Sequence, residues 1–504
     1  MITLRKLSFG YPQSTQSLFH DLSLTLQSGF TAIIGPNGSG KSTLLKLLAG
    51  ELTPDGGVIE STQQIVFCEQ RTDDPPMNAA EFLDDWDPEA FELRGRLKVP
   101  DEALERWQQL SHGERKRVQI ACALWQQPEL LLIDEPTNHI DASGRALLSD
   151  ALERFSGVGV IVSHDRDLLD KLCVQSVWLE NGRAEVFPGG YSESQASLRQ
   201  QKLGVQRKRE RLGREAKKLA TETARRRERA SNADAQRSKR GIDIKDSDAR
   251  ERIDRARLSG KDGTAGKLLR QLDGRVTQNA QALAGLEVEK SYASGIWVAG
   301  ETSKANSLLS RPAGQISLGA GRLLRHPDLR MQPTDRICVS GDNGSGKSTL
   351  LETLLKDLTL DPARVVVMPQ EITAEESTEL LMQVRALPNS ELGQAMSIVR
   401  RLGSNPARLL ESVIPSPGEV RKLKLALGIV QTPHLLILDE PTNHLDVPAI
   451  ESLESALVDC PCGLLFVSHD KQLTKRLART QWMITRQADG HSKLEEKLLD
   501  TALS

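Results

Sequence analysis

The chain is poor in aromatic residues, which make up only 4% of its 504 residues, and its six cysteines include no C-x-x-C pair. Scattered cysteines argue against zinc and iron–sulfur sites and indicate reduced thiols. Cys460-Pro461-Cys462 is interpreted as a turn before a strand. No apolar run approaches the ~20 residues that span a bilayer, and the first residues have the pattern of a strand instead of a signal peptide. These absences predict a cytoplasmic protein without a membrane domain.

Net charge is also nearly absent, at −2, but the charge is unevenly distributed. Residues 201–270 contain 23 Lys and Arg against 11 Asp and Glu, a net charge of +12, so the rest of the chain carries −14. A basic middle between acidic flanks indicates an anionic partner for the middle. The length is sufficient for two or three domains with complete cores.

What the sequence does contain is one glycine-rich loop twice, at 35–42 and at 341–348, each fitting G-x-x-x-x-G-K-[ST]. Each copy follows a short apolar run and opens a helical pattern, which is the context that a phosphate-binding loop requires. The backbone N–H groups of such a loop surround phosphate oxygens at the N-terminus of a helix. Lys41 and Lys347 are expected to meet the outer phosphates, and the serine after each lysine is expected to hold Mg²⁺. The predicted nucleotide-binding residues are Gly35, Pro36, Asn37, Gly38, Ser39, Gly40, Lys41, Ser42 and Thr43, and Gly341, Asp342, Asn343, Gly344, Ser345, Gly346, Lys347, Ser348 and Thr349.

The repeat extends beyond the loops. Residues 130–141 match 435–446, and residues 160–165 match 465–470. The loop lysine precedes the glutamate of the first match by 94 positions in one copy and 93 in the other, and that glutamate precedes a histidine by 29 in both. Each apolar run ends in polar residues, as a buried parallel strand does when it delivers chemistry at its carboxyl end. The sequence therefore predicts an α/β fold with two modules of the same kind.

Four pairs of polar residues follow these strands, with one member of each pair in each module. The aspartates are placed to contact Mg²⁺, and the glutamates to polarise a water molecule against the terminal phosphate. The histidines are expected to touch the same phosphate, and the glutamines to sense the metal and the attacking water. The pairs are Asp134 and Asp439, Glu135 and Glu440, His164 and His469, and Gln70 and Gln370.

The segment between the modules, 195–300, has a different composition and predicts a helical hairpin. Residues 200–240 lack proline and are rich in good helix formers. A stretch with several glycines, 241–274, is expected to form an irregular tip, and helix is expected to resume over about 267–290. A helix of ~40 residues would be ~60 Å long. Its basic side chains are expected to contact RNA phosphate, although a solvated hairpin would have the same composition; they include Arg225, Arg226, Arg227, Arg237, Lys239 and Arg240.

A serine, a glycine and a glutamate recur about twenty residues before each matched strand, at 110–115 and 415–420. These segments resemble the LSGGE signature of the ATP-binding-cassette superfamily. The resemblance implies that the signature of one module binds the terminal phosphate of ATP held by the other. His112 and Pro417 replace the first signature glycine, and proline lacks an N–H group, so weaker phosphate binding is expected at the second signature. Tyr11 is suited to stack on adenine, whereas the matching stretch 316–320 has no ring. The implied signature contacts are Ser111, Gly113, Glu114, Ser416, Gly418 and Glu419.

The sequence Asn-His-[Ile/Leu]-Asp after each glutamate, and the segment 187–192 that leads into the charged linker, resemble the ABC-F subfamily. This resemblance implies a soluble ATPase with two cassettes, at 1–194 and 301–504, joined by the linker 195–300. Each of its two ATP sites is composite and takes residues from both cassettes. It also implies a partner, the ribosome, with the linker contacting rRNA and P-site tRNA, and a monomer with intramolecular pairing of the cassettes. Both a translation factor and an antibiotic-resistance factor remain open. The alternatives are the ATP-binding subunit of a transporter with two fused cassettes and a DNA-repair cassette protein.

Overall fold

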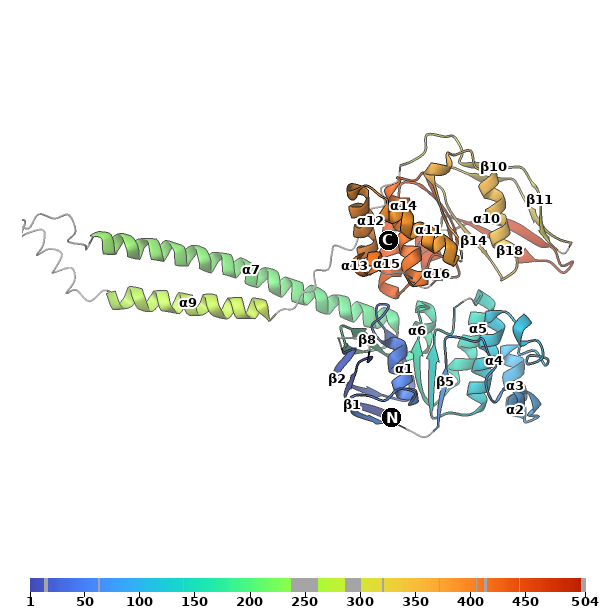
Figure 1. Ribbon diagram of the computed structural model, residues 1–504, viewed down its shortest axis with the longest axis horizontal. Helices are drawn as coiled ribbons and strands as arrows, with labels where there is room; N and C mark the ends of the chain where they lie inside the picture. Colours follow the sequence, from blue (N-terminus) through green and yellow to red (C-terminus); the bar gives the residue numbers. More distant parts are fainter. Residues whose placement is uncertain are drawn as a thin grey trace, which may run out of the picture. The chain divides into compact units, whose positions relative to one another are not determined.

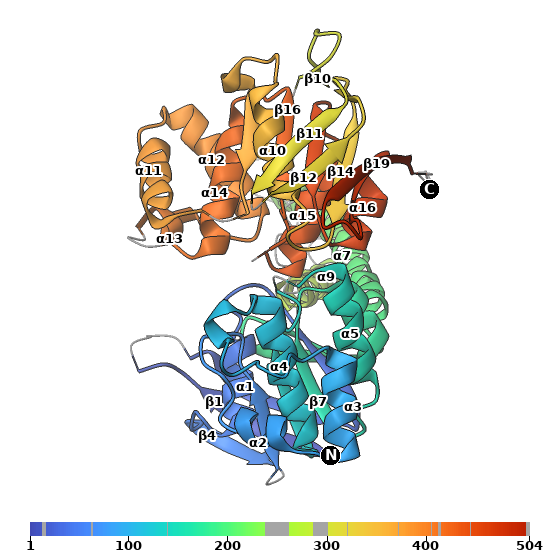
Figure 2. The ribbon, with the colours of Figure 1, turned by 90° about the vertical axis from the view of Figure 1, so that its right-hand side faces the viewer.

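The computed structural model describes most of the chain (Figures 1 and 2). The described residues are 1–12, 17–61, 64–138, 140–236, 262–285, 301–319, 321–370, 372–404, 406–411, 415–443 and 445–499. Met1–Ser194 and Ala293–Ser504 form one compact unit, and Gln195–Tyr292 form a second. His139, Arg237, Lys239 and Arg240 lie outside the described residues.

The first cassette is built on two sheets. Among its described residues, one sheet has the order β2 (Phe19–Leu26), β1 (Ile2–Phe9), β4 (Gly56–Glu60) and is antiparallel. The other has the order β5 (Ile65–Cys68), β6 (Leu130–Asp134), β7 (Val158–Val162), β3 (Gly29–Ile34), β8 (Cys173–Glu180), β9 (Arg183–Pro188) and is parallel except for the β8–β9 pair. Its helices are α1 (Lys41–Ala49), α2 (Ala79–Asp84), α3 (Pro88–Leu97), α4 (His112–Trp125), α5 (Ala142–Glu153) and α6 (Arg166–Leu172).

The centre of the parallel sheet explains why its strands are continuous apolar runs. Every residue of β6 and of β7 is buried, because a parallel sheet is covered on both faces. Leucines of α1 share one core cluster with β1, β2 and β3, while α4 and α5 contribute to a second cluster. The carboxyl ends of β3, β6 and β7 consequently meet at one edge of the sheet, where the polar residues follow.

The second cassette repeats this arrangement, with eight of its described strands in one larger sheet. Its order is β11 (Gly314–Gly319), β12 (Arg322–His326), β19 (Ser492–Leu498), β18 (Thr480–Arg486), β14 (Arg336–Gly341), β17 (Gly463–Val467), β16 (Leu435–Asp439), β15 (Val365–Met368). A short ribbon pairs β10 (Leu309–Arg311) with β13 (Leu329–Met331). Its helices are α10 (Lys347–Lys356), α11 (Ala374–Arg385), α12 (Asn389–Arg401), α13 (Pro406–Glu411), α14 (Pro417–Val430), α15 (Val447–Val458) and α16 (Lys471–Leu477). The predicted α/β class with two phosphate-loop cassettes is confirmed.

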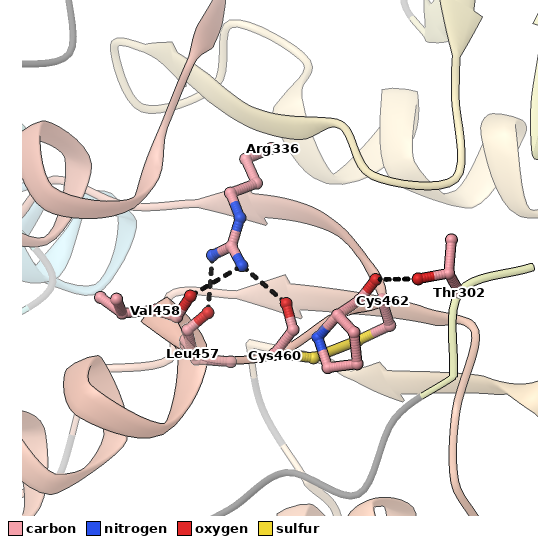
Figure 3. The surroundings of a disulfide bond; sticks show 7 residues. Thr302, Arg336, Leu457, Val458, Cys460 and Cys462 are labelled. Atoms are coloured by element: carbon pink, nitrogen blue, oxygen red, sulfur yellow. Dashed lines mark hydrogen bonds between the residues drawn. A yellow bond between two sulfur atoms is a disulfide. The ribbon is translucent and has the colours of Figure 1, made fainter. Parts of the chain in front are cut away.

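Cys460 and Cys462 form a disulfide in the turn between α15 and β17 (Figure 3). The turn is where the sequence predicted it, but the expectation that all thiols are reduced is wrong for this pair. The Cα atoms are 5.6 Å apart, which is within the range that a disulfide spans. Arg336 fastens the same turn, because its guanidinium donates to the carbonyl oxygens of Leu457 at 2.6 Å and Cys460 at 2.7 Å. The other four cysteines are buried thiols.

The second unit consists of two described helices, α7 (Tyr191–Gln236) and α9 (Asp262–Ala284), which lie side by side (Figure 1). Leu219 and Leu272 are buried in this hairpin. Arg227 pairs with Asp273 at 3.1 Å. The predicted helical hairpin is therefore present, but helix α9 begins at Asp262, inside the stretch that was expected to be irregular.

Candidate active sites

Both glycine-rich loops enter their helix through a position that only glycine can occupy. Gly40 precedes α1 with φ 97°, and Gly346 precedes α10 with φ 106°. A Cβ atom would lie 2.6 Å from the Phe19 ring at Gly40 and 2.6 Å from Leu318 at Gly346. Left-handed backbone and lack of space together require glycine. The loops therefore hold their backbone N–H groups at a helix N-terminus, which favours a bound anion.

The lysine after each of these glycines folds back over its own loop. Lys41 Nζ donates to the carbonyl oxygens of Gly35 at 2.9 Å and Pro36 at 3.1 Å. Lys347 Nζ makes the two equivalent bonds, of 2.7 and 3.0 Å, within the second loop. Burial lowers the pKa of both lysines, and the neighbouring carboxylates oppose this shift. An ammonium has three N–H donors, so each lysine keeps one donor for a phosphate oxygen.

An aspartate at the end of a buried strand faces the serine of the loop in both cassettes. Ser348 Oγ donates to Asp439 Oδ2 at 3.0 Å, and Ser42 lies beside Asp134, where it favours the ionised carboxylate. Burial raises the pKa of both aspartates. Asp134 Oδ1 is buried without a hydrogen-bond partner among the described residues. A buried carboxylate oxygen without a donor, beside a hydroxyl, suits a hard cation, so these residues fit the expected Mg²⁺.

The glutamate that follows each aspartate has a left-handed backbone, with φ 45° at Glu135 and 47° at Glu440. Such a conformation costs a non-glycine residue roughly 1–2 kcal/mol and is found preferentially at functional sites. Burial raises the pKa of Glu135 to about 8 and that of Glu440 to about 7. The structure brings the predicted histidines to these glutamates: His164 Nε2 lies 3.1 Å from Glu135 Oε1, and His469 Nε2 lies 3.4 Å from Glu440 Oε1.

His469 is neutral at physiological pH. Burial lowers its pKa to about 3, and the positive charges of Lys347 and Arg145 act in the same direction. Its contact with Glu440 is consequently not an ion pair, and the ring can offer one N–H and one lone pair.

The aspartate that ends each Asn-His-x-Asp motif touches the phosphate loop of the opposite cassette. Asp446 Oδ2 accepts a hydrogen bond from Asn37 N at 2.7 Å, and Asp141 Oδ2 accepts one from Asn343 N at 3.3 Å. The second oxygen of each carboxylate caps the helix that follows, by accepting from Ala449 N at 3.0 Å in the second cassette and from the equivalent glycine in the first. Sequence analysis did not single out these two aspartates as site residues.

A buried ion cluster also joins the two cassettes. Arg166 of α6 pairs with Glu454 and, at 2.9 Å, with Asp470. Arg476 approaches Glu454 from the other side, at 3.0 Å. Arg166 and Glu454 are almost completely buried, with side-chain exposures of 4% and 3%. Removal of one member would leave an uncompensated buried charge.

The second site encloses a cavity of about 390 Å³. Most of its lining comes from the second cassette, and the first cassette contributes Ile140 and Arg145. None of the first signature's three predicted residues lines it, so this cavity lacks the implied signature contact. The lining residues are Ile140, Arg145, Leu318, Arg322, Asn343, Gly344, Gly346, Lys347, Ser348, Thr349, Gln370, Asp439, Glu440, Asn443 and His469. Gln370 is thus placed with the other second-site residues, whereas Gln70 is an exposed residue after β5.

Both signature segments begin a helix in the same way. Ser111 and Ser416 are N-caps, and each forms a reciprocal capping box with the glutamate three residues later, Glu114 or Glu419. Pro417 occupies the first helical position, where a missing N–H removes no intrahelical bond. The proline is therefore compatible with the helix, and Gly113 and Gly418 lie in the first turn of α4 and α14.

The two sites differ where the sequence predicted an adenine contact. Tyr11 is 45% exposed and its hydroxyl lies 3.0 Å from Thr43 Oγ1, which keeps the ring beside the first phosphate loop. In the second cassette Leu318 and Arg322 line the cavity. Arg322 Nη2 donates to Gly344 O of the phosphate loop at 2.6 Å.

One buried cation in each cassette was missed by sequence analysis. Lys116 of α4 donates to the carbonyl oxygens of Glu69 at 2.5 Å and Asp134 at 3.1 Å. Arg421 of α14 donates to Glu440 O at 2.8 Å. Both residues follow the signature serine by five positions, and this equal offset is the signal that was available. Each cation ties the signature helix to the strand ends of its own active site.

Comparison with known proteins identifies the cassettes. The profile of the family described as "ABC transporter" matches residues 19–138 and 324–443, one match in each cassette. These segments contain both phosphate loops and both Asp-Glu pairs, so the chain is an ATPase with two ABC-type cassettes. In the described residues no helix is both long and apolar enough to cross a membrane.

Similar proteins extend the match through the linker. The erythromycin resistance ATP-binding protein MsrA of Staphylococcus epidermidis is 28% identical over 468 residues, covering 91% of this chain and 92% of that protein. The ribosome protection protein VmlR of Bacillus subtilis is 28% identical over 498 residues, covering 96% of this chain and 87% of that protein. Both proteins are therefore similar to this chain over nearly its whole length, through both cassettes and the segment between them.

Solved structures support the same fold. The archaeal ribosome recycling factor aABCE1 has a TM-score of 0.62 and 19% identity, with 97% of this chain and 89% of that chain covered. The RNase-L Inhibitor also has a TM-score of 0.62 at 19% identity, with 97% and 90% covered. At this level of identity the likeness concerns the fold alone.

Proposed function

We propose that this ATPase acts on the ribosome, either as a translation factor or as a ribosome-protection factor that confers antibiotic resistance. The observation that carries the proposal is similarity to the ribosome protection protein VmlR over 96% of the chain. The similarity to an erythromycin resistance protein over 91% of the chain points in the same direction. The place of action would be the cytoplasm.

The hairpin supports a nucleic-acid partner. Between Tyr191 and Glu228, helix α7 carries twelve Lys and Arg against five Asp and Glu. Arg225, Arg226 and Arg227 are consecutive on this helix; Arg226 pairs with Glu222 and Arg227 with Asp273. Lys and Arg side chains bind RNA phosphate with a strong dependence on salt. The proposed contacts are therefore rRNA and P-site tRNA, reached by a monomer whose two cassettes pair within the chain.

The chemistry of the proposed cycle depends on residues of the two cassettes. The phosphate loop of one cassette binds ATP through its backbone N–H groups and its lysine, and the signature of the other cassette completes the site. Ser42 with Asp134, and Ser348 with Asp439, are the residues that would hold Mg²⁺, which neutralises phosphate charge when bound. Glu135 and Glu440 orient the attacking water, and His164 and His469 hold these glutamates in place.

The test uses a chain in which Glu135 and Glu440 are both replaced by glutamine. The amide keeps the shape of the carboxylate but cannot accept a proton, so ATP should bind without being hydrolysed and the closed protein should accumulate on ribosomes. The measurement is co-sedimentation with 70S ribosomes in the presence of ATP or ADP. A chain with Lys41→Ala and Lys347→Ala is the matched control, because it should not close with ATP.

Sedimentation of the Glu→Gln chain free of ribosomes in ATP would contradict the proposal. Recovery with membranes instead would favour the alternative, a subunit of a transporter with two fused cassettes. If the ribosomal outcome holds, minimum inhibitory concentrations of macrolides, lincosamides, phenicols and pleuromutilins with and without expression separate the two proposed roles. A rise with expression identifies a resistance factor.

A further inference from the structure

The two ATP sites receive different side chains from across the cassette interface. Asp141 reaches the second phosphate loop at Asn343, and Asp446 reaches the first at Asn37. Side chains four positions apart lie on the same face of a helix. The residue four positions after Asp141 is Arg145, and the residue four positions after Asp446 is Ile450. The pseudo-equivalent positions thus differ by one positive charge.

Arg145 is directed to the second site. It lines the 390 Å³ cavity together with Lys347, Glu440 and His469 of the opposite cassette. Its charge contributes to the lowered pKa of His469. The side chain is 22% exposed, so the guanidinium is largely withdrawn from solvent while it remains open to the cavity.

The guanidinium is held in place but retains donors. Arg145 Nε donates to Ile140 O at 3.0 Å, and Nη1 donates to Asp165 Oδ2 at 3.2 Å. Within the described residues Nη2 makes no hydrogen bond. A guanidinium has five N–H donors in a planar fork, so three remain. This is the arrangement of a group that is oriented by two fixed bonds and can bind an anion with the others.

At the first site the equivalent position is occupied by Ile450, although Lys422 of the second cassette places a buried positive charge near Lys41. Ile450 is 1% exposed and belongs to the hydrophobic core of the second cassette. An isoleucine cannot donate a hydrogen bond or stabilise charge on a phosphate. The first cassette therefore supplies a cation, Arg145, to the second site, whereas the second cassette supplies none to the first site from the equivalent position.

We propose that Arg145 binds the terminal phosphate of ATP at the second site, and that the second site consequently distinguishes ATP from ADP more strongly than the first. This inference rests on the proposed binding of ATP at both sites. Arg145, in the first turn of α5, would thus contact the nucleotide of the opposite cassette, in addition to the signature residues. The chemical group recognised is the γ-phosphate, since ADP lacks it.

The experiment isolates the second site in the full chain with Lys41→Ala, which disables the first site. In this background Arg145 is replaced by isoleucine, the residue at the equivalent position, by lysine, and by glutamine. Binding of fluorescent ATP and ADP analogues is titrated. Loss of a hydrogen bond to a charged group reduces affinity by about tenfold or more. Arg145→Ile should show this loss for ATP and a change of less than about twofold for ADP, and Arg145→Lys should recover part of it.

Arg154→Ile is the matched control, because Arg154 follows the same helix, is 62% exposed and, among the residues that the structure describes, pairs only with Glu92. It should leave both affinities unchanged. Arg145→Gln keeps a donor for Ile140 O and removes the charge, so it tests the inference if the isoleucine variant does not fold. Equal losses of ATP and ADP affinity, or no loss of either, would overturn the inference while leaving the two-site ATPase intact. Failure of the Lys41→Ala parent to bind ATP would contradict the proposed function itself.

Discussion

The buried ion cluster between the cassettes allows a quantitative prediction. Replacing Arg166 by methionine removes the cation that faces Glu454 and Asp470, whose side chains are 3% and 16% exposed. Breaking a buried pair from one side costs about 3–5 kcal/mol, because the remaining charge stays buried. Arg476 still approaches Glu454 at 3.0 Å, so the expected cost is at the lower end, about 3 kcal/mol. For a cassette-sized cooperative unit this corresponds to a fall in Tm of about 6–12 °C.

The measurement is thermal unfolding of the nucleotide-free chain, with Arg166→Met compared to Arg154→Met. The second substitution removes an exposed ion pair to Glu92, and exposed pairs contribute about 0–1 kcal/mol. Adding Glu454→Met to Arg166→Met should recover part of the loss, because the more deeply buried of the two carboxylates is then removed. Equal Tm values for the two single variants would refute the reasoning that the cluster is buried and mutually dependent.

Three further outcomes follow from the site. Gly346→Ala should abolish nucleotide binding at the second site, because the new methyl group would lie 2.6 Å from Leu318 in a left-handed backbone; calorimetric titration of a chain with the first site disabled measures this. Tyr11→Ala should weaken ATP binding at the first site by about 1–3 kcal/mol, the contribution of stacking on a base, whereas Tyr11→Phe should bind nearly as the parent does. Chelation of divalent cations should stop ATP turnover in a phosphate-release assay, and Mg²⁺ should restore it; persistence of turnover would contradict the role given to the Ser–Asp pairs.

Much of each active site could be predicted from the sequence because the residues are set by local rules. The phosphate loop needs glycine at fixed offsets, and buried strands end in the aspartate and glutamate that follow them. The capping boxes of the signatures are likewise local, since Ser111 and Glu114 are three residues apart. These features depend on neighbours in the chain, so spacing alone locates them.

Most of the contacts that sequence analysis missed are made between segments distant in the chain. Lys116 is interpretable only when the strand ends lie beside the signature helix, and the partners of Arg145 and Arg166 come from both cassettes. Helix α9 was predicted to start later because glycine in a helix costs up to about 1 kcal/mol. The Cys460–Cys462 disulfide depends on backbone geometry that composition does not encode.

The two carboxylate oxygens of Asp141, and likewise those of Asp446, make separate contacts. One oxygen caps the helix that follows, and the other accepts a hydrogen bond from the phosphate loop of the opposite cassette. Asparagine caps helices as well as aspartate does, yet it brings no negative charge. Exchanging either aspartate for asparagine would thus change the contact between the cassettes while keeping the helix cap. The strength of the contact between the cassettes can therefore change independently of the stability of each cassette.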